Sequence, residues 1–365
     1  MSNSPELSSY AHVSSVIVLP ARDLSTALAE RWSELQLCDS ALASPFFRPE
    51  FTMAVGAVRN DAFFAVLEEG NTPRGFLPFQ RQRRGIGKPI GAFMSDYQGV
   101  VAEPGLSWEP LRVVNSCGLR AWNFDHLIAS QLPFKGFHQS RSESPYLELS
   151  NGFEAYRRDR AGSQLIPTIR RRARKLEREV GDLRFVAAES DLGVLRTLQG
   201  WKSHQYRETG VPDIFALGWP TELLEHILAV RQPEFSGMLS ALYAGDELVA
   251  GHMGMRSRDT WHWWFPAYAP RFARYSPGLI LLLHMAAVAA SIGVRRIDLG
   301  KGNEPYKHRF KSAAVPLAVG SVASRPLRAR RQVAARARAA VLYSPAGGTA
   351  KAVANSVRRR TSTFH

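Results

Sequence analysis

Hydrophobic positions along this chain recur at two spacings, every second residue over short runs and every third or fourth residue over longer ones. The first spacing is typical of strands and the second of amphipathic helices. A strand is expected at Val13–Leu19, followed by a helix that begins at a cap on Asp23 and runs to about Cys38. The other elements expected before residue 150 are a helix at Pro49–Val58, strands at Ala62–Leu67 and Gly75–Gln80, a helix at Trp108–Cys117, and strands at Asn123–Ile128 and Tyr146–Leu149.

The second half of the chain repeats this plan. Asn151 is placed to cap a helix, with Glu154 reaching back to the cap, and a basic helix is expected at Gln164–Val180. The elements expected after it are a strand at Arg184–Ala188, helices at Leu192–Tyr206 and Glu222–Arg231, strands at Met238–Tyr243, Leu248–Arg256 and Thr260–Tyr268, an apolar helix at Ser276–Ile292, and strands at Arg295–Leu299 and Val315–Ser324.

Strands interleaved with helices predict an α/β fold, and the presence of hairpins predicts mixed sheets flanked by helices. The hairpins at 63–81 and 238–256 occupy equivalent places in the two halves, which favours a duplicated lobe. We therefore expect an N-terminal lobe over residues 1–150, a C-terminal lobe over residues 151–324 and a basic tail over residues 325–365.

Composition is that of a soluble globular protein, with 45% hydrophobic and 22% charged residues. The longest apolar run, Leu279–Ala290, is shorter than a membrane span and contains His284. The Ser-rich N-terminus lacks the features of a signal peptide, so we expect a cytoplasmic protein. Cys38 and Cys117 have no close partner, which favours two buried thiols and no metal site.

The net charge of +15 is concentrated at the C-terminus, where residues 325–365 carry ten Lys or Arg and no acid. This tail predicts an anionic partner, such as nucleic acid or a membrane surface that would hold the protein peripherally at the inner membrane, or else is a solvated, disordered tail. Basic residues also crowd the helix near residue 170, where they suit an anionic polymer, a lipid pyrophosphate carrier or RNA, or else form a solvated face. These residues are Arg170, Arg171, Arg172, Arg174, Lys175 and Arg178.

The chemically informative stretch begins where Ser276-Pro277-Gly278 opens the apolar helix. Serine suits a cap and proline suits the first helical turn. A helix start offers free N–H groups and a positive dipole end to phosphate, and Arg271 and Arg274 lie just upstream. An ordinary capped helix would have the same sequence.

A second element follows the next expected strand, with the sequence Asp298-Leu299-Gly300-Lys301-Gly302-Asn303-Glu304-Pro305-Tyr306-Lys307. Gly300 and Gly302 allow tight backbone geometry at a strand end, where loops commonly hold ligands. A simple turn with surface charges is the alternative.

The order of these two elements resembles the CelD/BcsL-like acetyltransferases associated with cellulose and polysaccharide biosynthesis, which are GNAT-fold proteins related to the FemAB peptidyltransferases. The resemblance covers about residues 44–324 and includes three further segments. These are Ser44-Pro45-Phe46-Phe47 with Pro49-Glu50-Phe51, then Gly75-Phe76-Leu77-Pro78-Phe79, and Arg174-Lys175-Leu176-Glu177.

The resemblance implies two GNAT-like lobes, with acetyl-CoA or another acyl-CoA bound in the second lobe. The positions that would hold the CoA pyrophosphate are Arg271, Arg274, Tyr275, Ser276, Pro277 and Gly278. Acyl transfer needs a base for the acceptor proton and an acid for the leaving thiolate. His252, Asp298 and Glu304 remain open as the base, and each has a structural alternative.

Three further residues have candidate roles. Tyr306 would donate a proton to the thiolate, and Lys307 would bind phosphate or an acceptor carboxylate. Trp263 would form a stacking platform for a sugar, or else belong to the core.

These features together predict an acyl-CoA-dependent acyltransferase that acts on a saccharide or nucleotide-sugar in bacterial polysaccharide or cell-envelope biosynthesis. One alternative is a FemAB-type transferase that uses aminoacyl-tRNA, and the other is a non-catalytic accessory protein of a polysaccharide synthase. The long heptad segment expected of a tRNA-binding helical hairpin is not seen in the sequence, so nucleic acid is not the expected partner.

Overall fold

The computed structural model describes residues 12–327 and separates into two compact units. The first unit contains residues 12–42, 47–140 and 318–327, and the second contains residues 43–46 and 141–317. Each unit has its own hydrophobic core. The division into lobes at residue 150 stays a prediction, and the basic tail lies outside the described residues from residue 328 onward.

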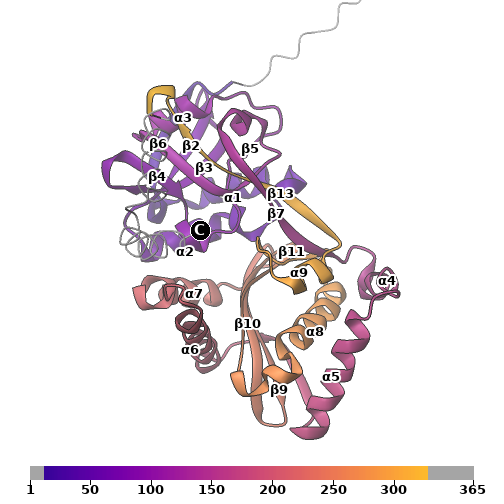
Figure 1. The fold of residues 1–365 in the computed structure, drawn as a ribbon. Coiled ribbons are helices and arrows are strands. Elements are labelled where there is room, and N and C mark those ends of the chain that lie inside the picture. The colour runs from indigo at the N-terminus through magenta and orange to yellow at the C-terminus, as the bar shows by residue number, and fades with distance from the viewer. Residues whose placement is uncertain (1–11, 328–365) are drawn as a thin grey trace, which may run out of the picture. The chain divides into compact units, whose positions relative to one another are not determined.

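The first unit is a mixed sheet with helices against it (Figure 1). Its strands are β1 (Ser15–Pro20), β2 (Ala62–Glu69), β3 (Thr72–Gln82), β4 (Ile86–Pro89), β5 (Val101–Ala102), β6 (Ala121–Ile128) and the end of β13 (Ala313–Ala323). They lie in the order β1-β2-β3-β4-β6-β13, with β5 against β3. Neighbours are antiparallel from β1 to β4, and β4 pairs with β6 in parallel. The helices are α1 (Thr26–Leu37), α2 (Pro49–Val58) and α3 (Pro110–Ser116).

Two expectations about the first unit were wrong. The cap of α1 is Ser25, whose Oγ accepts a hydrogen bond from the N–H of Leu28 at 3.4 Å, because the turn at Asp23 is a separate 3-10 segment. Cys38 is exposed, whereas Cys117 is buried as expected.

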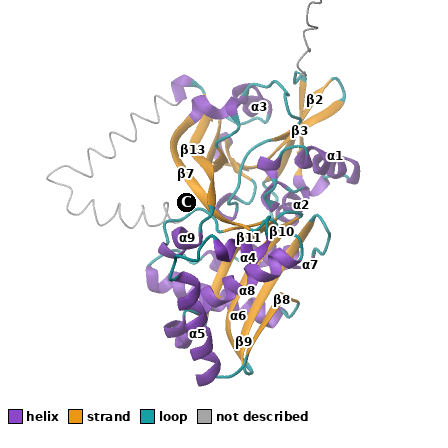
Figure 2. Cartoon of the chain, turned by 90° about the vertical axis from the view of Figure 1, so that its right-hand side faces the viewer, coloured by secondary structure: helices purple, strands orange, loops and turns teal. Residues whose placement is uncertain are grey.

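The second unit is a mixed sheet with helices on both faces (Figures 1 and 2). Its strands are β7 (His138–Glu148, from residue 141), β8 (Leu183–Glu189), β9 (Phe235–Ala244), β10 (Glu247–Ser257), β11 (Thr260–Tyr268) and β12 (Arg296–Asp298). Their order is β7-β12-β11-β10-β9-β8, antiparallel except for the parallel pair β11 and β12. The helices are α4 (Gly152–Arg158), α5 (Leu165–Glu179), α6 (Leu192–Thr209), α7 (Trp219–Ala229), α8 (Pro277–Ser291) and α9 (Pro305–Phe310).

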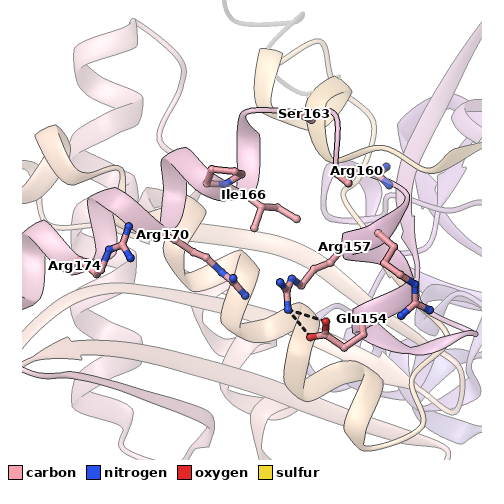
Figure 3. A pocket seen from close by; sticks show the side chains of 10 residues that line it. Glu154, Arg157, Arg160, Ser163, Ile166, Arg170 and Arg174 are labelled. Carbon is pink, nitrogen blue, oxygen red and sulfur yellow. Dashed lines mark hydrogen bonds and ion pairs between the residues drawn. The ribbon is translucent and has the colours of Figure 1, made fainter.

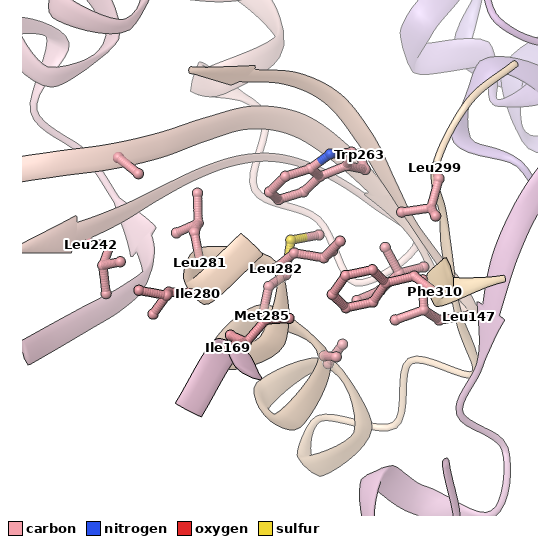
Figure 4. Packing of buried hydrophobic residues seen from close by; sticks show 14 of the residues in the cluster. Leu147, Ile169, Leu242, Trp263, Ile280, Leu281, Leu282, Met285, Leu299 and Phe310 are labelled. Carbon is pink, nitrogen blue, oxygen red and sulfur yellow. The ribbon is translucent and has the colours of Figure 1, made fainter. Parts of the chain in front are cut away.

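Helix α8 is the centre of the core of this unit. Its buried residues pack against Ile169 of α5, Leu242 of β9, Trp263 of β11 and Phe310 of α9 (Figure 4). Burying each large apolar side chain contributes about 1.5–3 kcal/mol, so this packing fixes where α8 begins relative to β11. Helices α6 and α7 lie on the opposite side of the sheet from α5 and α8 (Figure 1).

The expected elements of the second half are confirmed, and the bounds of β11 are those expected. One detail was wrong. Asn151 makes no side-chain cap to α4, and Glu154 pairs with Arg157 at 2.7 Å. Among residues 12–327, no helix is long and apolar enough to cross a membrane. The same residues contain no group of three His, Cys, Asp or Glu side chains that would hold a metal ion.

Candidate active site

The turn before α8 differs from the capped helix start that the sequence favoured. Ser276 lies in the left-handed region, with φ 54° and ψ 54°, and its side chain does not cap the helix. Its Oγ instead accepts a hydrogen bond from Nη1 of Arg172 at 2.5 Å. A left-handed serine costs about 1 kcal/mol or more, so Arg172 on α5 and the packing of α8 hold this turn in place.

The two arginines upstream of α8 have acidic partners. Arg271 pairs with Glu247, and Arg274 lies 3.5 Å from Glu179. The hydroxyl of Tyr275 donates to Glu179 at 2.6 Å, and this bond is the largest cause of a lowered pKa at that carboxyl. Both arginine side chains are more than half exposed, at 62% and 67%, so a phosphate could draw them from these surface pairs.

Gly278 keeps the first turn of α8 open. A Cβ added there would meet only Cδ1 of Tyr268 at 3.8 Å, which is an ordinary contact. The carbonyl of Ser276 already accepts from the N–H groups of Leu279 and Ile280. The helix start therefore has room beside Gly278 and a positive dipole end with cationic side chains nearby, which are the features of an anion site.

Strands β11 and β12 pair only over the first residues of β11. Their parallel pairing covers Thr260↔Arg296, Trp261↔Ile297 and His262↔Asp298, whereas β11 continues to Tyr268. The chain after β12 turns away at Gly300, where φ is 70° and the N–H donates to Oδ1 of Asp298 at 2.8 Å. The far half of β11 therefore runs on without β12 beside it, up to the 3-10 segment η8 (Pro270–Tyr275) that leads into α8.

A cluster of polar side chains lies by this opening. Nε1–H of Trp263 donates to the hydroxyl oxygen of Tyr306 at 3.3 Å. Burial is the main cause that raises the pKa of Tyr306 to about 12, so the phenol keeps its proton at neutral pH. Lys307 is buried and donates to the carbonyls of Gly300 and Lys301 at 3.2 Å, and it lies 3.2 Å from the Glu304 carboxylate.

Asp298 belongs to a separate buried group. Its Oδ1 accepts from Oγ of Ser144 at 2.7 Å and lies 3.4 Å from Nδ1 of His262. Asp298, Ser144 and His262 are each at most 1% exposed. The carboxylate therefore fixes β7, β11 and the turn at Gly300 to one another.

His252 is completely buried on β10. Its Nε2 accepts from the main-chain N–H of Trp264 at 3.1 Å, and its ring stacks on Trp263 at 4.6 Å. Burial lowers its pKa to about 3, so the imidazole is neutral at physiological pH. Trp263, on which it stacks, is only 4% exposed and is part of the core cluster.

The structure thus brings Trp263, Tyr306, Lys307 and Glu304 together, with the ring of His252 stacked on Trp263. Of the three residues predicted as candidates for the base, Glu304 is the accessible one, with its side chain 54% exposed. The residues predicted for the pyrophosphate lie together at the start of α8.

Sequence reasoning missed Lys202 on α6. Its Nζ donates to Oε1 of Gln205 at 3.1 Å and to the carbonyl of Pro266 on the open half of β11 at 3.4 Å. Burial lowers its pKa to about 8, partly offset by Glu304 and reinforced by Lys307. A perturbed lysine beside a strand opening is typical of functional sites. The sequence signal was weak, because a single lysine next to Trp201 resembles any solvated helix position.

Comparison with known proteins agrees with this geometry. Residues 163–308 match the family model described as an acetyltransferase (GNAT) domain. The C-terminal domain of a candidate lysylphosphatidylglycerol synthetase from Agrobacterium fabrum is similar over 87% of this chain and 97% of its own, with 15% identity and a TM-score of 0.53. A tandem GNAT protein from the clavulanic acid biosynthesis pathway is similar over 84% of this chain and 98% of its own, with 8% identity and a TM-score of 0.48.

FemX is similar over 74% of this chain and 90% of its own, with 10% identity and a TM-score of 0.48. No curated protein sequence matches the chain. The family match spans the chain from α5 to α9, which includes the start of α8, the strand opening and the Tyr306 cluster. Residues 163–308 are therefore a GNAT acetyltransferase domain, and the protein is an acyltransferase. The predicted α/β fold, with mixed sheets flanked by helices, is confirmed, and the second unit contains the GNAT domain.

Proposed function

We propose that this protein transfers an acyl group from acetyl-CoA or another acyl-CoA to a hydroxyl or amine of a saccharide or nucleotide-sugar, in bacterial polysaccharide or cell-envelope biosynthesis. The observation that carries the proposal is the opening between β11 and β12, which ends at the anion-suited start of α8. The free edge of β11 would pair with the extended, amide-containing arm of the acyl-CoA, and the start of α8 would bind its pyrophosphate.

The residues present fit an acyl-CoA. Arg271, Arg274 and the open turn at Gly278 would hold its pyrophosphate, while Tyr275 and Pro277 shape the turn and Ser276 is fixed by Arg172. The thioester is the group that supplies the acyl carbon. The chain's own residues bind and orient the thioester and the acceptor, and they move the protons.

The accessible carboxylate and the buried phenol suit the two proton transfers. In the proposal, Glu304 accepts the proton of the attacking acceptor group, and Tyr306 holds the proton that the departing sulfur takes. Asp298 holds the turn at Gly300 that leads to these groups, and His252 holds the backbone of β11 at Trp264. Lys307 holds the loop and the Glu304 carboxylate, and Lys202 lies where it would hydrogen-bond the acceptor.

The saccharide or nucleotide-sugar acceptor is proposed on the CelD/BcsL-like resemblance of the motifs around Ser276-Pro277-Gly278 and Asp298–Lys307. We also propose a cytoplasmic setting, with the basic tail as a contact to the inner membrane, because residues 325–365 carry ten Lys or Arg and no acid. Flotation of the full chain and of a chain ending at Ser324 with anionic vesicles tests the tail. Equal flotation of the two would remove the membrane contact from the proposal.

The first experiment measures thermal unfolding with acetyl-CoA, longer acyl-CoAs and free CoA. A ligand at about a hundred times its Kd stabilises the folded chain by about 2.7 kcal/mol, which shifts the melting temperature measurably. The test variant is Gly278→Glu, which brings a carboxylate to the proposed phosphate position. Gly278→Ala is the matched control, because its Cβ has room.

We expect an acyl-CoA to stabilise the parent and Gly278→Ala but not Gly278→Glu. The acceptor is then sought by thiol release with sugars and nucleotide-sugars. Stabilisation of all three proteins by the same amount would refute the assigned phosphate position. No stabilisation of the parent by any acyl-CoA would refute the proposed donor and favour aminoacyl-tRNA or the accessory role.

A further inference from the structure

A pocket of about 450 Å³ opens between α4 and the first turns of α5, on the outside of the second unit (Figure 3). This volume is within the range of small-molecule sites. The charged residues that line it are Arg157, Arg158, Arg160, Arg170, Arg174 and Glu154. The pocket therefore concentrates positive charge beyond what its single carboxylate balances.

Two of the arginines are held in place by the protein. Arg157 pairs with both oxygens of Glu154 at 2.7 Å. The guanidinium of Arg160 donates to the carbonyls of Phe310 and Lys311 and lies over the ring of Tyr156 at 4.2 Å. These contacts give the pocket a fixed cationic wall on the α4 side.

Three arginines of the lining, one at the end of α4 and two on α5, supply charge without a protein counter-charge. Among residues 12–327, Arg158, Arg170 and Arg174 have no carboxylate within ion-pair distance. In Figure 3 the guanidinium groups of Arg157 and Arg170 point toward one another. Glu154 balances the charge of Arg157, whereas Arg170 has no such partner, so an anion between the two groups would neutralise Arg170.

Helical spacing separates this pocket from the start of α8. Arg170 and Arg174 are four residues apart and share a face of α5 with Ile166. Arg172 projects from the other side of the helix, where it donates to Ser276. Helix α5 thus presents cations both to the pocket and, from its other side, to the start of α8.

Arginine is the residue best suited to phosphate, because its planar fork makes paired hydrogen bonds with two oxygens. Ile166 and Pro167 add apolar surface to the lining, and the volume exceeds that of a lone phosphate. We propose that the pocket between α4 and α5 binds the phosphoryl or pyrophosphoryl group of a phosphate ester, either a soluble one or a lipid head group. This site is additional to the proposed acyl transfer and does not depend on it.

The experiment titrates the full chain with sodium pyrophosphate by isothermal calorimetry. A parallel arm measures flotation with phosphatidylcholine vesicles that contain or lack phosphatidylglycerol. The test variants are Arg170→Ala, Arg174→Ala and both together. Arg171→Ala is the matched control, because it removes the same charge from an exposed position of α5 outside the pocket lining. Each titration is repeated with Gly278→Glu, which removes any binding at the start of α8 and leaves only binding at the pocket.

We expect each pocket substitution to weaken binding about tenfold and the pair about a hundredfold, since a hydrogen-bonded charge contributes about a factor of ten. Arg171→Ala and Gly278→Glu should leave the binding that depends on Arg170 unchanged. A loss confined to pyrophosphate identifies a soluble ester, and a loss confined to vesicles identifies a lipid head group. Equal weakening by Arg170→Ala and Arg171→Ala, or no binding in either arm by the folded parent, would overturn the proposal.

Discussion

Replacing Lys202 with methionine should make the protein more stable at neutral pH. Burial is the largest cause that lowers the pKa of this lysine from 10.5 to about 8, and the net shift corresponds to about 3 kcal/mol against the charged amine. Methionine removes this cost but also removes the hydrogen bonds to Gln205 and Pro266, worth about 1 kcal/mol each. The expected net gain at pH 7 is about 1 kcal/mol.

The sign of this effect reverses with pH. The pKa of Lys202 in the folded state is below that in the unfolded state, so between about pH 8 and pH 10.5 the unfolded chain holds a proton that the folded chain has lost. Stability of the parent therefore rises through this window, and the desolvation cost is fully present below it. Near pH 10.5 the Lys202→Met variant should be less stable than the parent by about 2 kcal/mol.

Urea unfolding of parent and variant at pH 7 and pH 10 measures this difference, because other titrating groups cancel between the two proteins. Lys202→Arg is the control, since its guanidinium keeps its charge at both pH values. Its stability relative to Lys202→Met should not change. A direct check is the NMR titration of the methylated Lys202 amine. A measured pKa near 10, or a parent-to-methionine difference that is independent of pH, would refute this reasoning.

Other substitutions test the site and its supports. Tyr306→Phe should lower kcat by about 10²–10³, measured by thiol release from the acyl-CoA, while the lost hydrogen bond from Trp263 should lower the stability by only about 1 kcal/mol. Ser276→Gly should be more stable than Ser276→Ala by about 1 kcal/mol in urea unfolding, because both lose the bond to Arg172 but only glycine relieves the left-handed backbone. In the folded protein a thiol reagent should modify Cys38, which is exposed, and spare Cys117, which is buried and has a pKa raised to about 12. An unchanged kcat would contradict the role of Tyr306. Equal stability of the two serine variants would contradict the strained backbone at Ser276, and rapid modification of Cys117 would contradict its burial.

Local patterns in the sequence predicted most elements, because those patterns and the tertiary packing agree. The strand Thr260–Tyr268 has strong aromatic character and a turn before it, and the helix Pro49–Val58 begins with a proline suited to its first turn. The start of β7 at His138 was missed because its first residues are polar. The cap at Ser276 was misassigned because a distant residue, Arg172, takes up the serine hydroxyl.

The candidate site was predictable where its residues are neighbours in sequence. The start of α8 and the loop after β12 could be found from glycine, proline and charge in short segments. The position of Lys202 against β11 and the joint pocket of α4 and α5 depend on which elements pack together. Contacts of this kind join residues far apart in the chain, so no local pattern reveals them.

The way the chain threads through β7 and β13 has a consequence for its synthesis on the ribosome. The first unit requires residues 318–327, where Ser321 bonds to Asn123, and the second unit requires residues 43–46, where the ring of Phe46 lies against His262 and Trp264. Neither unit can finish folding until the chain through β13 has been translated. The apolar strands of the N-terminal segments therefore stay exposed until β13 has been translated. A chaperone that shields nascent chains should raise the yield of folded protein.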